Sequence, residues 1–149
     1  MNTTQLPDDF REFLRLLDDH DVRYLIVGGY AVGFHGYPRS TGDMDVWVQT
    51  TSENADRLVE VLEEFGFDVP ELDTGLFLEP DRVIRMGHPP LRIELLTSVS
   101  GVGFSEAFRT RVQDTIDEIP VCFIGLEKLK ENKRASGRHK DLNDLEHLP

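Results

Sequence analysis

The chain has 149 residues, and its 28 acidic against 16 basic side chains give a formal net charge of −12. This charge argues against a protein that coats DNA nonspecifically, because such binding depends on the neutralisation of phosphates. Residues 1–13 lack the basic start and apolar stretch of a signal peptide, and no apolar run is long enough to span a bilayer. We therefore expect one cytoplasmic domain over residues 1–149, with no membrane contact.

The N-terminal third of the chain predicts helices and strands in alternation. Apolar residues at helical spacing predict an amphipathic helix over residues 7–20. The run VRYLIVGG at residues 22–29 predicts a short buried strand ended by glycines, and residues 31–37 predict a brief helix after that turn. The alternation of DMDVWV at residues 43–48 predicts a strand whose two faces differ.

The rest of the chain continues this mixture, starting with an amphipathic helix that begins at Ser52 and stops at Gly66. The predicted elements after it are strands at residues 81–86, 91–97 and 119–124, a short helix at 103–112, and helices at 125–136 and 139–148. This order predicts an α/β or α+β fold in which helices pack on a β-sheet. We expect a sheet-containing core at residues 22–124 and C-terminal helices at residues 125–148.

Three acidic residues are candidates for a metal site. Asp43 and Asp45 are two apart on a predicted strand, so their side chains project from the same face and can bind one hard cation such as Mg²⁺ or Mn²⁺. Glu94 stands among Ile93 and leucines in the strand LRIELL, where a buried carboxylate needs a metal or an arginine as partner. We expect Arg92 on the other face of that strand, where it is a poor partner for Glu94, and this leaves a metal partner possible.

Other residues are candidates for binding phosphate. Gly28 and Gly29 allow the backbone to approach a ligand closely, and a helix after them would direct free N–H groups at an anion such as the phosphates of a nucleoside triphosphate (NTP). Arg39 lies four residues before Asp43, where it can bind phosphate or pair with the acids.

The C-terminal segment concentrates positive charge, with six of the 16 basic residues between Lys128 and Lys140. From this segment we predict Lys133 as a nucleotide-binding residue. Arg134, Arg138 and Lys140 are candidates for the same patch, although a basic run on terminal helices is more often a solvated face. Asp141 and Asp144 are weaker metal candidates than the three strand acids.

Two aromatic residues near the acids have a structural interpretation that we favour over a functional one. Trp47 shares a strand face with Asp43 and Asp45 and could stack on a base, but a tryptophan inside a strand is usually part of the core. His35 is expected to be a structural hydrogen-bonding residue.

The segment VGGYAVGFHGYPRSTGDMDVWV resembles the signature of the nucleotidyltransferase superfamily that includes DNA polymerase beta. It is most similar to the minimal prokaryotic members related to antitoxin and abortive-infection nucleotidyltransferases, and the similarity extends to LRIELLTSVSG and to the C-terminal segment. The resemblance implies a small mixed sheet, Mg²⁺ on Asp43, Asp45 and Glu94, and NTP phosphates on Gly28 and Gly29. Many catalytic relatives carry Ser in place of Gly29 and often Asp in place of Glu94.

From these features we predict a Mg²⁺-dependent enzyme that transfers a nucleoside monophosphate from an NTP to a hydroxyl of a protein or RNA acceptor. The alternative is a catalytically weak or inactive binding partner, of the antitoxin type, in a two-protein system. A regulator that binds phosphate or metal without nucleotide is a third possibility.

Overall fold

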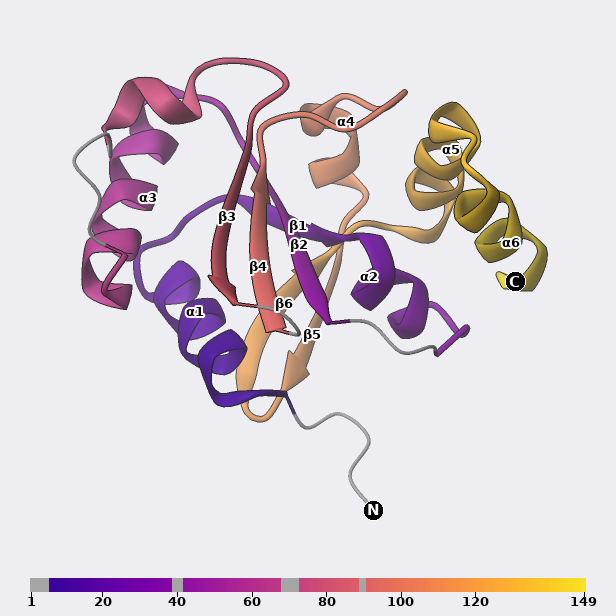
Figure 1. Ribbon diagram of the computed structural model, residues 1–149, viewed down its shortest axis with the longest axis horizontal. Coiled ribbons are helices and arrows are strands. Elements are labelled where there is room, and N and C mark those ends of the chain that lie inside the picture. Colours follow the sequence, from indigo (N-terminus) through magenta and orange to yellow (C-terminus); the bar gives the residue numbers. More distant parts are fainter. Residues whose placement is uncertain (1–5, 39–41, 68–72, 89–90) are drawn as a thin grey trace.

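Alternating apolar strands and amphipathic helices build a layered α/β structure in the computed structural model, which describes residues 6–38, 42–67, 73–88 and 91–149 (Figure 1). The helices are α1 (Asp8–Asp19), α2 (Gly28–Phe34), α3 (Ser52–Phe65), η1 (Thr74–Phe77, a 3₁₀ helix), α4 (Phe104–Arg109), α5 (Leu126–Ser136) and α6 (His139–His147). The strands are β1 (Tyr24–Val27), β2 (Asp43–Val48), β3 (Val83–His88), β4 (Leu91–Leu96), β5 (Val112–Ile116) and β6 (Ile119–Phe123).

The described strands form one mixed sheet in the order β3-β4-β2-β1-β6-β5. Strand β2 is parallel to β4 and β1 is parallel to β6, whereas the remaining neighbours are antiparallel. The predicted α/β fold with a small mixed sheet is therefore confirmed. Strands β1 and β2 lie in the middle of the sheet, so the acid-bearing end of β2 is flanked by other strands on both sides.

Two elements were missed by the sequence interpretation. Strand β5 is an edge strand whose side chains are almost all exposed, so it lacks the apolar alternation that marks a half-buried strand. Its first residue, Val112, falls within the helix predicted at residues 103–112, and that helix instead ends at Arg109. The short η1 helix lies in a stretch that the sequence predicts as a loop.

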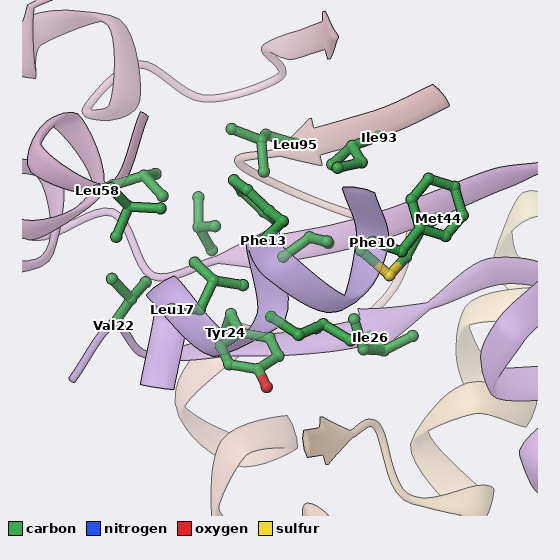
Figure 2. Close-up of a cluster of buried hydrophobic side chains, with 14 of the residues drawn as sticks. Phe10, Phe13, Leu17, Val22, Tyr24, Ile26, Met44, Leu58, Ile93 and Leu95 are labelled. Carbon is green, nitrogen blue, oxygen red and sulfur yellow. The ribbon is translucent and has the colours of Figure 1, made fainter. Parts of the chain in front are cut away.

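The core has two layers, one on each face of the sheet. On one face, α1 and α3 cover the strands and bury Phe10, Phe13 and Leu58 against residues such as Met44 and Ile26 (Figure 2). The other face carries a smaller cluster in which α2, α4 and α5 contribute, and in which Trp47 is only 2% exposed. The predicted core position of Trp47 is confirmed, and so is the difference between the two faces of β2.

Helix α3 illustrates how local sequence signals fix the elements. Its N-terminus is capped by Thr51, whose side-chain oxygen accepts the backbone N–H of Asn54, and its C-terminus stops at Gly66 in the left-handed conformation with φ +95°. These are the ends that the sequence predicts. Among the described residues, no helix combines the length and apolarity needed to cross a membrane.

Candidate active site

The sheet register brings the three predicted acids together. Asp45 on β2 is the direct partner of Glu94 on the parallel strand β4, and Asp43 is the partner of Arg92 two residues earlier. Neighbouring strands are about 4.8 Å apart, so side chains on one face of such a pair are within contact distance. Acids from two separate strands thus lie side by side on one face of the sheet.

The glycine turn closes over Asp45 from the other side, because Val27 at the end of β1 pairs with Asp45. Gly28 follows with φ +67°, a conformation that L-residues with side chains rarely adopt. A Cβ atom on Gly28 would overlap Oδ2 of Asp45 and lie 3.0 Å from its Cγ. The position therefore needs glycine both for its backbone angle and for the approach of the carboxylate. Helix α2 begins at Gly28 itself, with Gly29 as its second residue.

Two arginines hold the outer acids. The Arg85 Nε on β3 donates to Glu94 Oε2 over 2.7 Å, and Arg92 contacts both carboxylate oxygens of Asp43 at 3.4 Å. The expectation that Arg92 lies on the opposite face from Glu94 is wrong, because residues two apart on a strand share a face. The acidic face is therefore a mixed cluster of three carboxylates and two guanidinium groups.

Asp45 is the most perturbed member of the cluster. Burial, together with a hydrogen bond to Glu94 and the negative charges of Glu94 and Asp43, raises the pKa of Asp45 to about 7, and the positive charge of Lys140 opposes this rise. Oδ1 of Asp45 is buried and has no hydrogen-bond partner among the described residues. A buried carboxylate oxygen without a donor is unfavourable unless a proton or a cation supplies the missing interaction.

The donor chemistry of this cluster suits a hard divalent cation. All three side chains offer carboxylate oxygens, the ligands that Mg²⁺ prefers, and the unpartnered Oδ1 of Asp45 is a free coordination position. As the side chains stand, however, no group of three acidic, histidine or cysteine residues in the described part of the chain is arranged to hold a metal ion. Two of the three carboxylates, those of Asp43 and Glu94, contact guanidinium groups instead.

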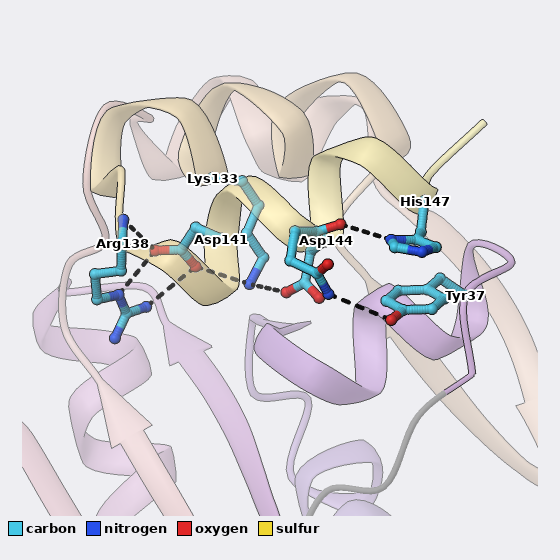
Figure 3. Close-up of polar contacts among 7 residues, drawn as sticks. Tyr37, Lys133, Arg138, Asp141, Asp144 and His147 are labelled. Atoms are coloured by element: carbon cyan, nitrogen blue, oxygen red, sulfur yellow. Dashed lines mark hydrogen bonds and ion pairs between the residues drawn. The ribbon is translucent and has the colours of Figure 1, made fainter.

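Lys133 is placed in a buried ion network between α5 and α6 (Figure 3). Its ammonium group lies 3.2 Å from Asp141 Oδ1 and 3.1 Å from Asp144 Oδ2, and its side chain is 5% exposed. Burial on its own would raise the pKa of Asp141, but hydrogen bonds from Arg138, Ser136 and Lys133 lower it below its usual range. The described contacts of Lys133 thus join two helices, and its predicted binding of nucleotide stays a prediction.

The positive charge of Lys140 lowers the pKa of Asp45, so this residue of the basic segment interacts electrostatically with the acid cluster. It is exposed at the start of α6. Arg138, in contrast, donates from Nε to Asp141 over 2.8 Å. The predicted single patch is therefore divided: Lys133 and Arg138 contact acids of α6, whereas Arg134 and Lys140 are exposed.

The remaining candidates have simpler outcomes. His35 donates from Nε2 to the carbonyl oxygen of Ile124 over 2.7 Å, which confirms its structural role. Arg39 lies outside the described residues, so its predicted contact with phosphate is untested. Two pockets on the described surface lie elsewhere, and none of Asp43, Asp45 and Glu94 lines them.

Comparisons with known proteins agree with the fold. No protein-family model and no curated protein matches the sequence. The structure is similar to the crystal structure of a proposed nucleotidyltransferase from Thermotoga maritima, with a TM-score of 0.59 and 14% identity over 92% of this chain and 88% of the other. It is also similar to an antigenic nucleotidyltransferase-like protein from Paracoccidioides brasiliensis, with a TM-score of 0.54 and 20% identity over 95% and 76% of the two chains. The chain therefore has a nucleotidyltransferase-like fold, as its resemblance to that superfamily predicts.

Proposed function

We propose that this protein is a Mg²⁺-dependent nucleotidyltransferase that transfers a nucleoside monophosphate from an NTP to a hydroxyl group of a protein or RNA acceptor. The observation that carries the proposal is the meeting of Asp45 and Glu94 across β2 and β4, directly against the Gly28 turn. The structural likeness to nucleotidyltransferase-like proteins supports the same reaction class through the fold alone.

In this proposal Asp43, Asp45 and Glu94 hold Mg²⁺, which supplies neutralisation of the charge that develops on the phosphates. Because Asp45 titrates near pH 7, binding of the cation releases a proton from the cluster. Arg85 and Arg92 leave the carboxylates on metal binding and become available to the anionic phosphates, which prefer the bidentate geometry of guanidinium groups.

The backbone around Gly28 and Gly29 would take the β- and γ-phosphates, and Lys140 at the rim would add positive charge. The acceptor oxygen attacks the α-phosphorus, a new P–O bond forms, and the bond from the α-phosphorus to the bridging oxygen of the pyrophosphate breaks. In this proposal Glu94 helps to activate the attacking hydroxyl by receiving its proton.

The alternative is a binding module that keeps the fold and has little or no turnover. The pairing of Asp43 and Glu94 with arginines favours this alternative, because it leaves no preformed metal site among the described residues. The two proposals differ in chemistry, since only the first covalently transfers a nucleotide.

A stepwise experiment separates them. A thermal-shift screen of the four NTPs with and without Mg²⁺ identifies a ligand, and α-labelled NTP is then incubated with the protein and with partners that co-purify with it. Label that becomes covalently attached to an acceptor only with Mg²⁺ supports the transferase. Stable co-purification of a partner that never acquires label from any of the four NTPs supports the binding module.

A further inference from the structure

A second polar site lies at the end of β1 opposite to the acids. Here Arg23, Arg57 and Arg111 line a pocket of about 410 Å³, which we call the arginine pocket. Strand β1 pairs with Asp45 through its last residue and with Val48 through its first, so about 10 Å of extended chain separates the two ends. The arginine pocket is therefore distinct from the candidate active site.

Arg111 is held by an aromatic ring and keeps an unused donor. Its guanidinium carbon lies 3.9 Å from the centroid of the Phe108 ring, and its Nη1 donates to the Phe108 carbonyl oxygen over 2.8 Å. Its Nε–H is buried and has no acceptor in the described part of the chain. Arg23 lies over the same ring at 5.4 Å. The Phe108 ring thus contacts two arginines that both line the pocket.

The arginines of this pocket have few carboxylate partners, although the chain has 28 acidic residues against 16 basic ones. Within the described residues, Arg23 and Arg111 form no ion pair, and Arg57 has only a 4.0 Å contact with the exposed Glu53. Arg57 also donates from Nη1 to the carbonyl oxygen of Asp21 over 3.3 Å. Exposed contacts of this length stabilise little, so most of the donor capacity of the three side chains is available to a ligand.

Further donors border the arginine pocket. The hydroxyl of Tyr24 points away from the apolar cluster (Figure 2), and its oxygen accepts the backbone N–H of Cys122 over 3.2 Å. Burial raises the pKa of Tyr24, so the hydroxyl stays a donor at any physiological pH. A second pocket shares Arg23 and Arg57 and runs along the first turn of α3, where backbone N–H groups favour negative charge.

We propose that the arginine pocket binds a phosphate group, either as the free anion or as the ester of a small phosphorylated molecule. Three guanidinium groups offer the forked donors that match phosphate oxygens, and the Nε–H of Arg111 gains its missing acceptor. Asp18 and Asp21 also line the pocket, and their charges oppose the anion. The ligand consequently binds more tightly once one of these carboxylates is neutralised.

The test uses the full-length, ¹⁵N-labelled protein in EDTA, so that metal-dependent binding at the acids is absent. Inorganic phosphate is titrated against sodium chloride of equal ionic strength while the arginine Nε–H resonances are recorded by NMR. We expect a saturable shift of the Arg111 Nε–H signal with phosphate only. Arg23→Gln and Arg57→Gln should each weaken binding at least about fivefold, and Asp18→Asn should strengthen it about twofold or more.

Arg109→Gln is the matched control, because Arg109 is an exposed arginine on α4 that does not line the pocket. It should leave the affinity unchanged. A parallel titration with AMP distinguishes the two sources of the phosphate group: tighter binding than that of inorganic phosphate identifies an ester, and equal binding identifies the free anion. The proposal is overturned if neither anion gives a saturable shift, or if the shift survives unchanged in both Arg23→Gln and Arg57→Gln proteins that circular dichroism shows to be folded.

Discussion

Asp45 and Glu94 lie opposite each other on the parallel strands β2 and β4, with their carboxyl groups hydrogen-bonded and Gly28 packed against Asp45. Two carboxyl groups this close are both ionised only when a cation lies between them. Without a cation, they share a proton. The pair therefore combines a buried, closely packed position with a carboxyl group whose pKa is raised. Each of the first two predictions follows from it.

The Gly28→Ala variant should be destabilised more than Gly66→Ala. Both glycines have positive φ, +67° and +95°, so both substitutions introduce backbone strain of about 1–2 kcal/mol. Only at Gly28 does the new Cβ overlap a neighbour, the Oδ2 of Asp45, whereas nothing lies within 4 Å at Gly66. Urea unfolding of the two variants measures the difference.

A double variant tests the cause. If the overlap with Oδ2 is responsible, Gly28→Ala should destabilise the Asp45→Ala protein much less than it destabilises the original chain, because only the Cβ of residue 45, at 3.2 Å, then remains close to the new Cβ. An equal loss of stability for Gly28→Ala and Gly66→Ala in the original chain would show that Asp45 does not pack against the glycine.

The Asp45→Asn variant should gain stability relative to the original protein as the pH rises. The folded pKa of Asp45 is about 7, above its ordinary value, so between about pH 4 and 7 the folded state holds a proton that the unfolded state has lost. The contribution of Asp45 to the stability of the original protein is therefore complete below about pH 4 and is lost as the pH rises towards 7. The asparagine of the variant does not titrate, so the variant has no such loss.

Urea unfolding from pH 5 to pH 8 checks this difference, which should grow by on the order of 1–4 kcal/mol across the range. Asp56→Asn, at an exposed position on α3, is the control and should show a constant difference. A pH-independent effect of Asp45→Asn would mean that Asp45 is ionised throughout and has an ordinary pKa.

Removal of the charge of Lys133 should destabilise the C-terminal helices. In Lys133→Met, the buried carboxylates of Asp141 and Asp144 lose their shared ammonium partner, a change that typically costs about 3–5 kcal/mol. Arg134→Met, at the next and exposed position of α5, should change the free energy of unfolding by no more than about 0.5 kcal/mol. Thermal unfolding compares the two, and similar melting temperatures would rule out a structural role for Lys133.

Release of Glu94 from Arg85 should strengthen metal binding. Arg85→Gln removes the guanidinium group that occupies Glu94 Oε2, so Mg²⁺ no longer competes with a fixed cation. We expect a severalfold tighter affinity for Mg²⁺ by calorimetry, and no change in Arg82→Gln, whose side chain pairs with Glu79 on the surface. Weaker Mg²⁺ binding in Arg85→Gln would mean that Arg85 supports the site.

Much of this arrangement can be predicted from sequence, because the elements that carry it have strong periodicity. Alternation in β2 separates Asp43, Asp45 and Trp47 from the residues that face α1 and α3, and the structure agrees. The same rule applied to β4 places Arg92 on the face that carries the acids. The prediction that Arg92 lies on the opposite face from Glu94 was wrong because it did not follow this rule.

The positions that sequence did not resolve depend on helix faces and on long-range contacts. Lys133 follows Leu126 and Leu129 at the spacing of the buried face of α5. This spacing indicates a buried position, but the charge of Lys133 and the neighbouring lysines favoured a solvated face. The electrostatic effect of Lys140 on Asp45 depends on the tertiary position of α6, which no local pattern in the sequence indicates. Strand β5 was not predicted because it is an exposed edge strand without apolar alternation.

The most direct test of the central claim is calorimetric titration with the NTP that gives the largest thermal shift, with and without Mg²⁺. The original protein should bind this NTP only when Mg²⁺ is present, Asp45→Asn should show no Mg²⁺-dependent binding, and Asp56→Asn should behave like the original chain. Equal Mg²⁺-dependent affinity in folded Asp45→Asn would contradict the proposal that Asp45, Glu94 and the glycine turn form a metal-dependent nucleotide site.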